Sequence, residues 1–165
     1  MSVTINPVDL RCCLGRFATG VCVVTVSTPD GPHGLTVNSF TAVSLDPPLV
    51  LVSISRRARG HDLVAGRPFG INILGAEQEL VARHFAGDPQ PGAVHWQENE
   101  FAPRLAGTLA YIGCGPWQIH DGGDHTLCLG RVVELDYRSG SALGYVYSRF
   151  TQLEEPVFGL EHIFG

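Results

Sequence analysis

Residues 34–55 read GLTVNSFTAVSLDPPLVLVSIS, and this stretch decides which fold the rest of the chain must fit. It holds two runs rich in β-branched and apolar residues, 35–45 and 49–55, which predict two strands. Asp46, Pro47 and Pro48 separate the runs, because proline donates no hydrogen bond to a sheet ladder. Backbone N–H groups at such a break, flanked by Ser, Thr and Asn, suit a flat ligand that is rich in hydrogen-bond acceptors.

The rest of the chain alternates short apolar runs with turns rich in glycine and proline. Helices are predicted at residues 7–18, where Pro7 suits the first turn, and at 61–65 and 76–86. Strands are predicted at 21–27, 69–74, 107–114, 115–120, 126–137 and 143–150. Residues 87–103 are expected to form a long functional or interface loop. This pattern indicates one mainly β domain covering residues 1–165.

The composition excludes several classes of function. With 16% charged residues and a net charge of −5, the chain lacks the basic balance of a nucleic-acid binder. No apolar run reaches the roughly 18 residues of a membrane span, and the N-terminus has no signal-peptide core, which predicts a cytoplasmic protein. There is no lysine, so Schiff-base and P-loop lysine chemistry are excluded. No GxGxxG motif opens a βαβ unit, which argues against a Rossmann domain.

The cysteines and histidines give no sign of a metal site. The five cysteines form no CxxC pair, and Cys22 and Cys128 lie in apolar strand runs, as expected of buried thiols in a reducing compartment. His120, Asp121, Asp124 and His125 flank a Gly-Gly turn that imposes no ligand geometry, so no metal is predicted there.

Four ordered segments together resemble one known family. They are residues 34–55, 15–25 (GRFATGVCVVT), 69–74 (FGINIL) and 123–132 (GDHTLCLGRV). In this combination the chain resembles the flavin reductase-like, FMN-binding split-barrel family, especially the small reductase components of two-component monooxygenases. The resemblance implies a split β-barrel with a few short helices, which binds FMN or FAD, uses NADH or NADPH, and forms a homodimer. It also implies transient transfer of reduced flavin to a monooxygenase.

The segment SRRARG at residues 55–60 has two interpretations. A cluster of charges in a turn is commonly a solvated surface feature. Because this one follows a buried strand and precedes a short helix, its arginines and the helix N-terminal amides also suit an anion. With the resemblance, the predicted anion is the flavin phosphate. Ala58 and Gly60 stand where the family usually carries hydroxyl side chains, so the contacts to phosphate are expected to differ in detail.

The resemblance also selects candidate site residues. His125, in the GDH tripeptide, is expected to touch the nicotinamide and is the one predicted catalytic residue. Arg83 and Phe85 lie at the end of a helix that is near the flavin in relatives, and Asn72 is an amide in an apolar strand, for which a structural hydrogen bond is the alternative. The full set of predicted cofactor-binding residues is Thr36, Val37, Asn38, Ser39, Ser53, Ile54, Ser55, Arg56, Arg57, Arg59, His61, Asn72, Arg83, Phe85, Tyr147 and Arg149.

Two other functions remain open at this point. On the same scaffold, a retained flavin can act directly on an organic substrate in a biosynthetic pathway. A non-catalytic module that stores or senses flavin is the other alternative. The C-terminal residues 153–165 are expected to pack across a partner subunit or to fray.

Overall fold

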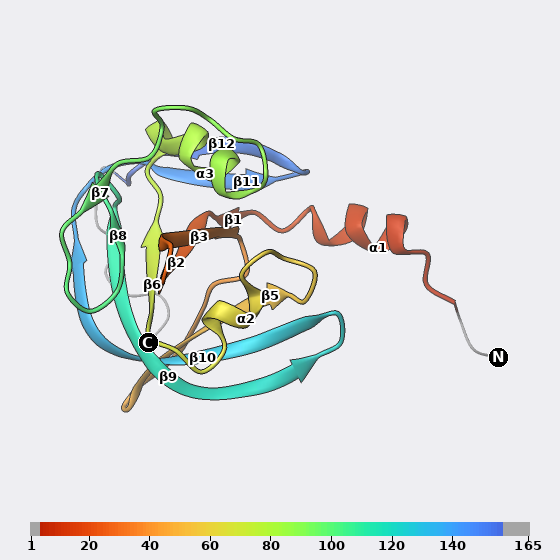
Figure 1. Ribbon diagram of the computed structural model, residues 1–165. Coiled ribbons are helices and arrows are strands. Elements are labelled where there is room, and N and C mark those ends of the chain that lie inside the picture. The colour runs from red at the N-terminus through yellow and green to blue at the C-terminus, as the bar shows by residue number, and fades with distance from the viewer. Residues whose placement is uncertain (1–3, 157–165) are drawn as a thin grey trace.

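The computed structural model describes residues 4–156 and shows a β-barrel with helices at its periphery (Figure 1). The helices are α1 (Pro7–Leu14), α2 (His61–Val64) and α3 (Glu79–Phe85), and the short 3-10 helix η1 (Ala76–Gln78) precedes α3. The strands are β1 (Thr19–Gly20), β2 (Cys22–Thr28), β3 (Gly31–Val37), β4 (Thr41–Leu45), β5 (Pro48–Ser55), β6 (Phe69–Ile73), β7 (Trp96–Gln97), β8 (Arg104–Leu105), β9 (Ala110–Gly122), β10 (His125–Tyr137), β11 (Ala142–Val146) and β12 (Arg149–Leu153). The predicted mainly β class is confirmed. The end of the predicted C-terminal tail, residues 157–165, lies outside the described residues.

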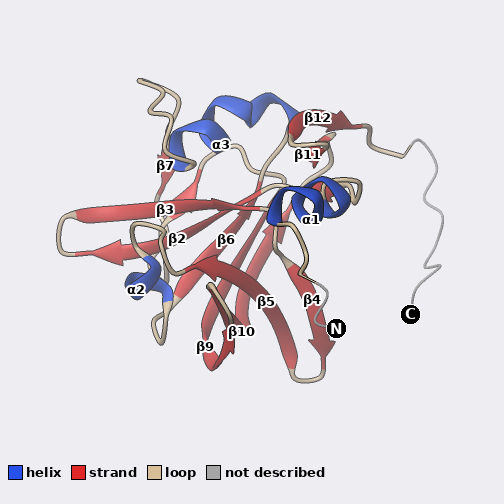
Figure 2. Cartoon of the chain, turned by 90° about the vertical axis from the view of Figure 1, so that its right-hand side faces the viewer, coloured by secondary structure: helices blue, strands red, loops and turns tan. Residues whose placement is uncertain are grey.

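The barrel is a seven-stranded antiparallel sheet in the order β3-β2-β6-β9-β10-β5-β4. β3 and β4 follow each other in the sequence, yet they form the two opposite edges of this sheet. Residues 38–40 carry the chain from one edge to the other, so the prediction of one strand over 35–45 is wrong. Figure 2 shows β3 and β5 approaching each other where the sheet closes on itself. The proline-containing segment at 46–48 only turns β4 into β5.

The barrel interior is filled by side chains from alternate strand positions. Val50, Val52 and Ile54 of β5 are buried, and the residues between them are half-buried. They join Phe69 and Ile71 of β6 in one continuous apolar cluster. Cys22 and Cys128 lie in this cluster, as predicted. Burial raises the pKa of the Cys22 thiol to about 12, so this group stays protonated at neutral pH.

A second, smaller core joins α3 to the C-terminal hairpin. Leu74, Val81 and Leu143 are buried in it, and Tyr145 and Phe150 pack against it. The predicted strand 143–150 is instead the hairpin β11–β12, since Tyr147 and Ser148 form a turn with φ of 52° and 57°. Successive residues with positive φ fit the primed turns that match the twist of a hairpin.

The remaining differences from the predicted elements are local. Residues 110–122 form one continuous strand, and the expected break near residue 115 is a shift in register opposite Leu129 and Gly130. The predicted helix 76–86 begins as the 3-10 turn η1. The long loop 87–103 contains β7, which pairs with β8. α1 ends four residues earlier than predicted, and Asn6 caps its first turn by accepting a hydrogen bond from the Val8 amide at 2.8 Å.

The side chain of Asn72, on β6, links β2 to β8. Its amide nitrogen donates to the Val23 carbonyl and to the Thr25 hydroxyl, both at 3.0 Å, and its carbonyl oxygen accepts from the Leu105 amide at 2.9 Å. The side chain is fully buried, so it lies away from any ligand-accessible surface. The geometry therefore favours a structural hydrogen-bonding role for Asn72 over cofactor binding.

We expect Asn72→Ala to lower the free energy of unfolding by about 3 kcal/mol, since three buried hydrogen bonds are lost, the Leu105 amide is left without its partner, and a cavity remains. Chemical denaturation measures this change. Gln118→Ala is the matched control, because this exposed amide on β9 bonds only a neighbouring exposed histidine, and we expect a change of less than about 0.5 kcal/mol. Equal losses in the two variants would contradict the structural role of Asn72.

Candidate active site

A cleft of about 890 Å³ opens where the sheet closes on itself. Its walls are β3 and the crossing at 38–40 on one side, the end of β5 with the turn after it on another, and the C-terminal end of α3 on the third. Ten of the predicted site residues line it: Thr36, Val37, Asn38, Ser39, Ser53, Ile54, Ser55, Arg59, Phe85 and His125. They come from five separate parts of the sequence and meet only because the barrel closes here.

Ser39 holds the inner end of the cleft together. Its hydroxyl donates to the Ser53 carbonyl at 2.8 Å and accepts from the Ser53 amide at 3.0 Å. This side chain therefore replaces a ladder partner for β5, and the Ser53 amide is not free to bind a ligand. Among the described residues, Asn38, Ser39 and Phe40 donate no hydrogen bond to a backbone carbonyl. The crossing thus supplies unpaired amide donors beside the cleft.

The outer end of the cleft is suited to an anion. Arg59 lines it, and the Arg59 carbonyl lies 3.1 Å from Nε2 of His33. His84 and His125 are the other ionisable residues of the lining, which includes no aspartate or glutamate. On a protein with a net charge of −5, a cleft without carboxylates is a local exception. A phosphate group meets no repulsion from acidic side chains there.

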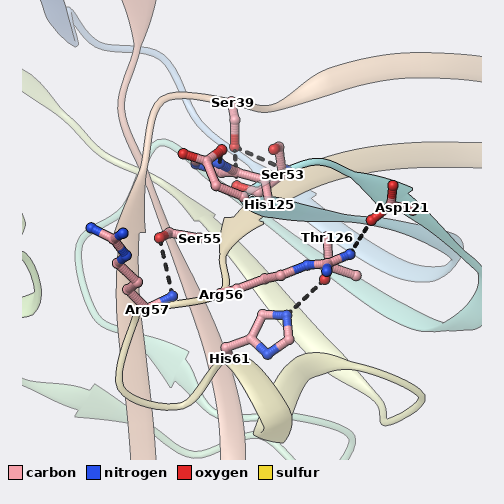
Figure 3. A network of polar contacts seen from close by, with 10 residues as sticks. Ser39, Ser53, Ser55, Arg56, Arg57, His61, Asp121, His125 and Thr126 are labelled. Carbon is pink, nitrogen blue, oxygen red and sulfur yellow. Dashed lines mark hydrogen bonds and ion pairs between the residues drawn. The ribbon is translucent and has the colours of Figure 1, made fainter. Parts of the chain in front are cut away.

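The arginine turn divides its side chains between different directions (Figure 3). Arg56 extends to Asp121 on the β9–β10 hairpin and forms an ion pair with it. Arg57 points to the other side of the turn, and its backbone amide donates to the Ser55 hydroxyl at 3.3 Å. Neither side chain lines the cleft, so Arg59 is the one guanidinium of this cluster that does.

His61 is a structural residue in this geometry. Its Nε2 lies 2.7 Å from the Thr126 hydroxyl and its Nδ1 lies 2.9 Å from the Asp62 carboxylate. These contacts fasten α2 to β10 and leave the ring outside the cleft lining (Figure 3). The prediction that His61 contacts the cofactor is therefore not supported by its position.

His125 lies at the edge of the cleft, at the first position of β10. Its Nδ1 is 2.7 Å from the Asp124 carboxylate, and its side chain is 41% exposed. The hydrogen bond and charge of His125 lower the pKa of the Asp124 carboxyl, with a smaller contribution from Arg57. The carboxylate therefore orients the ring through Nδ1, and within residues 4–156 Nε2 has no hydrogen-bond partner.

Phe85 closes the α3 side of the cleft. A Cβ atom at Gly34 would lie 2.7 Å from Cδ1 of this ring, so only glycine permits the close approach of β3 to α3. The ring also meets Trp96 edge-on, with centroids 6.0 Å apart. Phe85 is thus part of the core packing and of the cleft wall at once.

Three further predicted residues lie away from the cleft. Arg83 forms an ion pair with Glu79 at 2.6 Å and lies over the Phe150 ring, 5.4 Å from its centroid. Tyr147 is in the hairpin turn, where Arg16 covers its ring at 4.6 Å. Arg149 is an exposed residue of β12.

Several residues that line the cleft are not among the predicted site residues. His33, Gly34 and His84 carry no distinctive pattern, although His33 lies on the same strand as Thr36. Tyr145 and Phe150 line a small pocket of about 210 Å³ that adjoins the cleft at Thr36, Val37 and Asn38. Within residues 4–156 no group of three or more histidine, cysteine or acidic side chains is placed to hold a metal ion. None of the described helices is long and apolar enough to cross a membrane.

Comparisons with known proteins agree with this geometry. Residues 14–154 match the flavin reductase like domain. The chain is 44% identical over 155 residues to an NADH-dependent flavin reductase of a Rhodococcus species, covering 91% of this chain and 88% of that protein. It is 40% identical over 153 residues to the FMN reductase (NADH) SmoA of Agrobacterium fabrum, covering 89% of this chain and 88% of that protein.

A solved structure shares the fold as well. The NADH:FAD oxidoreductase SgcE6 of Streptomyces globisporus superposes with a TM-score of 0.81 and 39% identity, covering 93% of this chain and 98% of that one. Further relatives are named as reductase components of flavin-dependent monooxygenases. The chain belongs to the flavin reductase-like family of oxidoreductases. It is an NAD(P)H:flavin oxidoreductase on a split-barrel fold.

We expect Arg59→Ala to weaken flavin binding by about thirtyfold, since a charge-assisted hydrogen bond to phosphate contributes about 2 kcal/mol. Arg56→Ala should change the affinity by less than about threefold, because an exposed ion pair contributes little and Arg56 already pairs with Asp121. Quenching of flavin fluorescence on titration measures both constants. Equal losses in the two variants would contradict the assignment of the anion end to Arg59.

Proposed function

We propose that the protein reduces free FMN or FAD with NADH and releases the reduced flavin to a separate monooxygenase. The observation that carries this proposal is the cleft at the closure of the barrel, which has free amide donors at one end and a carboxylate-free, arginine-bearing end at the other. An isoalloxazine presents carbonyl and nitrogen acceptors, and its ribityl chain ends in a phosphate. The two ends of the cleft complement these two ends of the ligand.

The flavin, when bound, supplies the chemistry by accepting a hydride at N5 from C4 of the nicotinamide. The residues of the chain have to position the two rings in contact and to hold the phosphate. The crossing at 38–40 orients the ring by its amides, and Arg59 with His33 holds the phosphate. His125, whose ring is oriented by Asp124, contacts the nicotinamide at the edge of the cleft. Phe85 forms an apolar wall on the α3 side.

Release of the flavin is consistent with an open site. Most residues that line the cleft are half-buried or exposed, and they come from β3, the crossing, the turn after β5 and the end of α3. The names of the monooxygenase reductase components among the relatives support transfer of the product to an oxygenase. The five cysteines are all free, which supports a reducing compartment and hence a cytoplasmic location.

We expect the rate of NADH oxidation by the purified protein to rise with added free FMN or FAD and to saturate. Absorbance at the nicotinamide band follows the reaction. A protein that oxidises NADH at a rate independent of added flavin would be an enzyme with retained flavin. A protein that binds flavin without oxidising NADH would be a storage or sensing module, and either result would contradict the proposal.

His125→Ala should raise the KM for NADH by about tenfold, while the KM for flavin changes by less than about twofold, because the ring touches only the nicotinamide. Steady-state kinetics with each substrate varied in turn separates the two constants. Asp124→Asn is the companion variant, and we expect a smaller rise in the same constant since the ring loses its orienting partner. An unchanged KM for NADH in His125→Ala would remove this residue from the site.

The exposed apolar residues support a homodimer as the functional form. No residue of α1 is buried, and Leu14 and Phe17 are 64% and 78% exposed. α1 projects from the barrel in Figure 1, without packing against it. On β10, Leu135 and Tyr137 are 63% and 80% exposed. A second copy of the chain that covers α1 and this part of β10 would explain why both surfaces carry exposed apolar side chains.

We expect the protein to elute at about twice its chain mass of 17.8 kDa, and Leu135→Asp to shift it toward the monomer, because a buried carboxylate disfavours an apolar interface. Light scattering after size-exclusion chromatography measures the mass. Gln118→Asp, an exposed position on β9, is the control and should leave the mass unchanged. A monomeric parent protein would contradict the dimer.

A further inference from the structure

A second groove, of about 510 Å³, lies next to the flavin cleft. Its walls come from the β2–β3 hairpin, from β7 and from the residues around β8. Pro32 lines both cavities, so the groove begins where the cleft ends. Trp96 lines the groove and meets Phe85, which lines the cleft, with ring centroids 6.0 Å apart. The two cavities therefore share one wall.

The course of β3 determines which part of a bound ligand lies in the cleft and which part lies in the groove. The crossing at residues 38–40 follows one end of this strand, and His33, with the Arg59 carbonyl, lies near the other. Val37 and Pro32 are five steps apart along the strand, which corresponds to about 17 Å. A flavin with its ring at the crossing and its phosphate at Arg59 directs whatever follows the phosphate toward Pro32 and the groove.

The groove has the chemistry of a nucleoside site. Trp96 is 38% exposed and offers an indole face on which a purine can stack. Gln97, Glu98 and Glu100 offer acceptors for the amino group of adenine and for ribose hydroxyls.

The same groove disfavours a phosphate. Its two carboxylates repel a phosphate group, and Arg104 is already paired with Asp136 at 2.5 Å. The groove thus complements the cleft, which suits the phosphate and carries no carboxylate.

We propose that this groove binds the adenosine end of a dinucleotide, and that it allows the protein to use FAD as well as FMN. The inference rests on the proposed flavin reductase activity and names the flavin that this site accepts. FAD and NADH both carry an adenosine. The order of the residues along β3 favours the adenosine of FAD, because it follows the flavin phosphate directly.

The test compares Trp96→Ala with Trp117→Ala. Trp117 is also a partly exposed tryptophan, but it lines neither cavity. We expect Trp96→Ala to raise the KM for FAD by about tenfold, as loss of base stacking does, and to leave the KM for FMN within about twofold. Trp117→Ala should change neither constant.

A second arm distinguishes the two sources of adenosine. With FMN as acceptor, the KM for NADH is compared with that for reduced nicotinamide mononucleotide, which lacks the adenosine. A rise in the KM for NADH alone in Trp96→Ala would place the adenosine of NADH in the groove and would contradict its assignment to FAD. Unchanged constants for both FAD and NADH, or an equal rise for FMN and FAD, would overturn it.

Binding without turnover gives an independent measurement. In Trp117→Phe, Trp96 is the remaining tryptophan of the chain, and we expect titration with adenosine to quench its fluorescence in a saturable way. Glu98→Gln combined with Glu100→Gln keeps the indole and should weaken this binding. Absence of quenching would overturn the proposal even if the flavin reductase activity is present, and quenching without NADH oxidation would instead contradict the proposed function.

Discussion

The geometry of the site depends on the fact that the two edges of the sheet are joined by three residues. β3 and β4 are neighbours in the sequence and lie at opposite ends of the strand order, so residues 38–40 must close the barrel. Residues in such a crossing lie outside the strand ladders, and their amides are free to donate. The Ser39 hydroxyl supplies both hydrogen bonds that Ser53 would otherwise lack. The connection at residues 38–40 therefore creates both the unpaired amide donors and the cleft beside them.

Charge is distributed so that each part of the site accepts one part of a ligand. The chain carries a net charge of −5, yet the ionisable residues that line the main cleft are Arg59 and three histidines, without a carboxylate. Glu98 and Glu100 stand in the neighbouring groove, on the far side of Pro32. Asp121 pairs with Arg56 outside the cleft lining.

The sequence was sufficient for the class of fold, most strands and the main wall of the cleft, because apolar periodicity reports burial directly. It was insufficient where the outcome depends on tertiary geometry. Residues 35–45 have an unbroken β pattern, so the crossing at Asn38 could not be distinguished from a strand interior. Arg56, Arg57 and Arg59 are near neighbours in the chain, and only the conformation of the turn decides which one faces the cleft. Asn72 has the same sequence environment whether its amide serves the core or a ligand.

The contact between Gly34 and Phe85 limits how such a site can diverge. β3 is held on one side by its ladder with β2 and is approached on the other by an aromatic ring, so its backbone leaves no space for a larger residue. α3 is attached mainly through side-chain packing, which tolerates conservative exchange more readily than a ladder does. Changes in the width of the cleft between family members are therefore expected to arise on the helix. The strand acts as a fixed reference surface against which different ligands are accommodated.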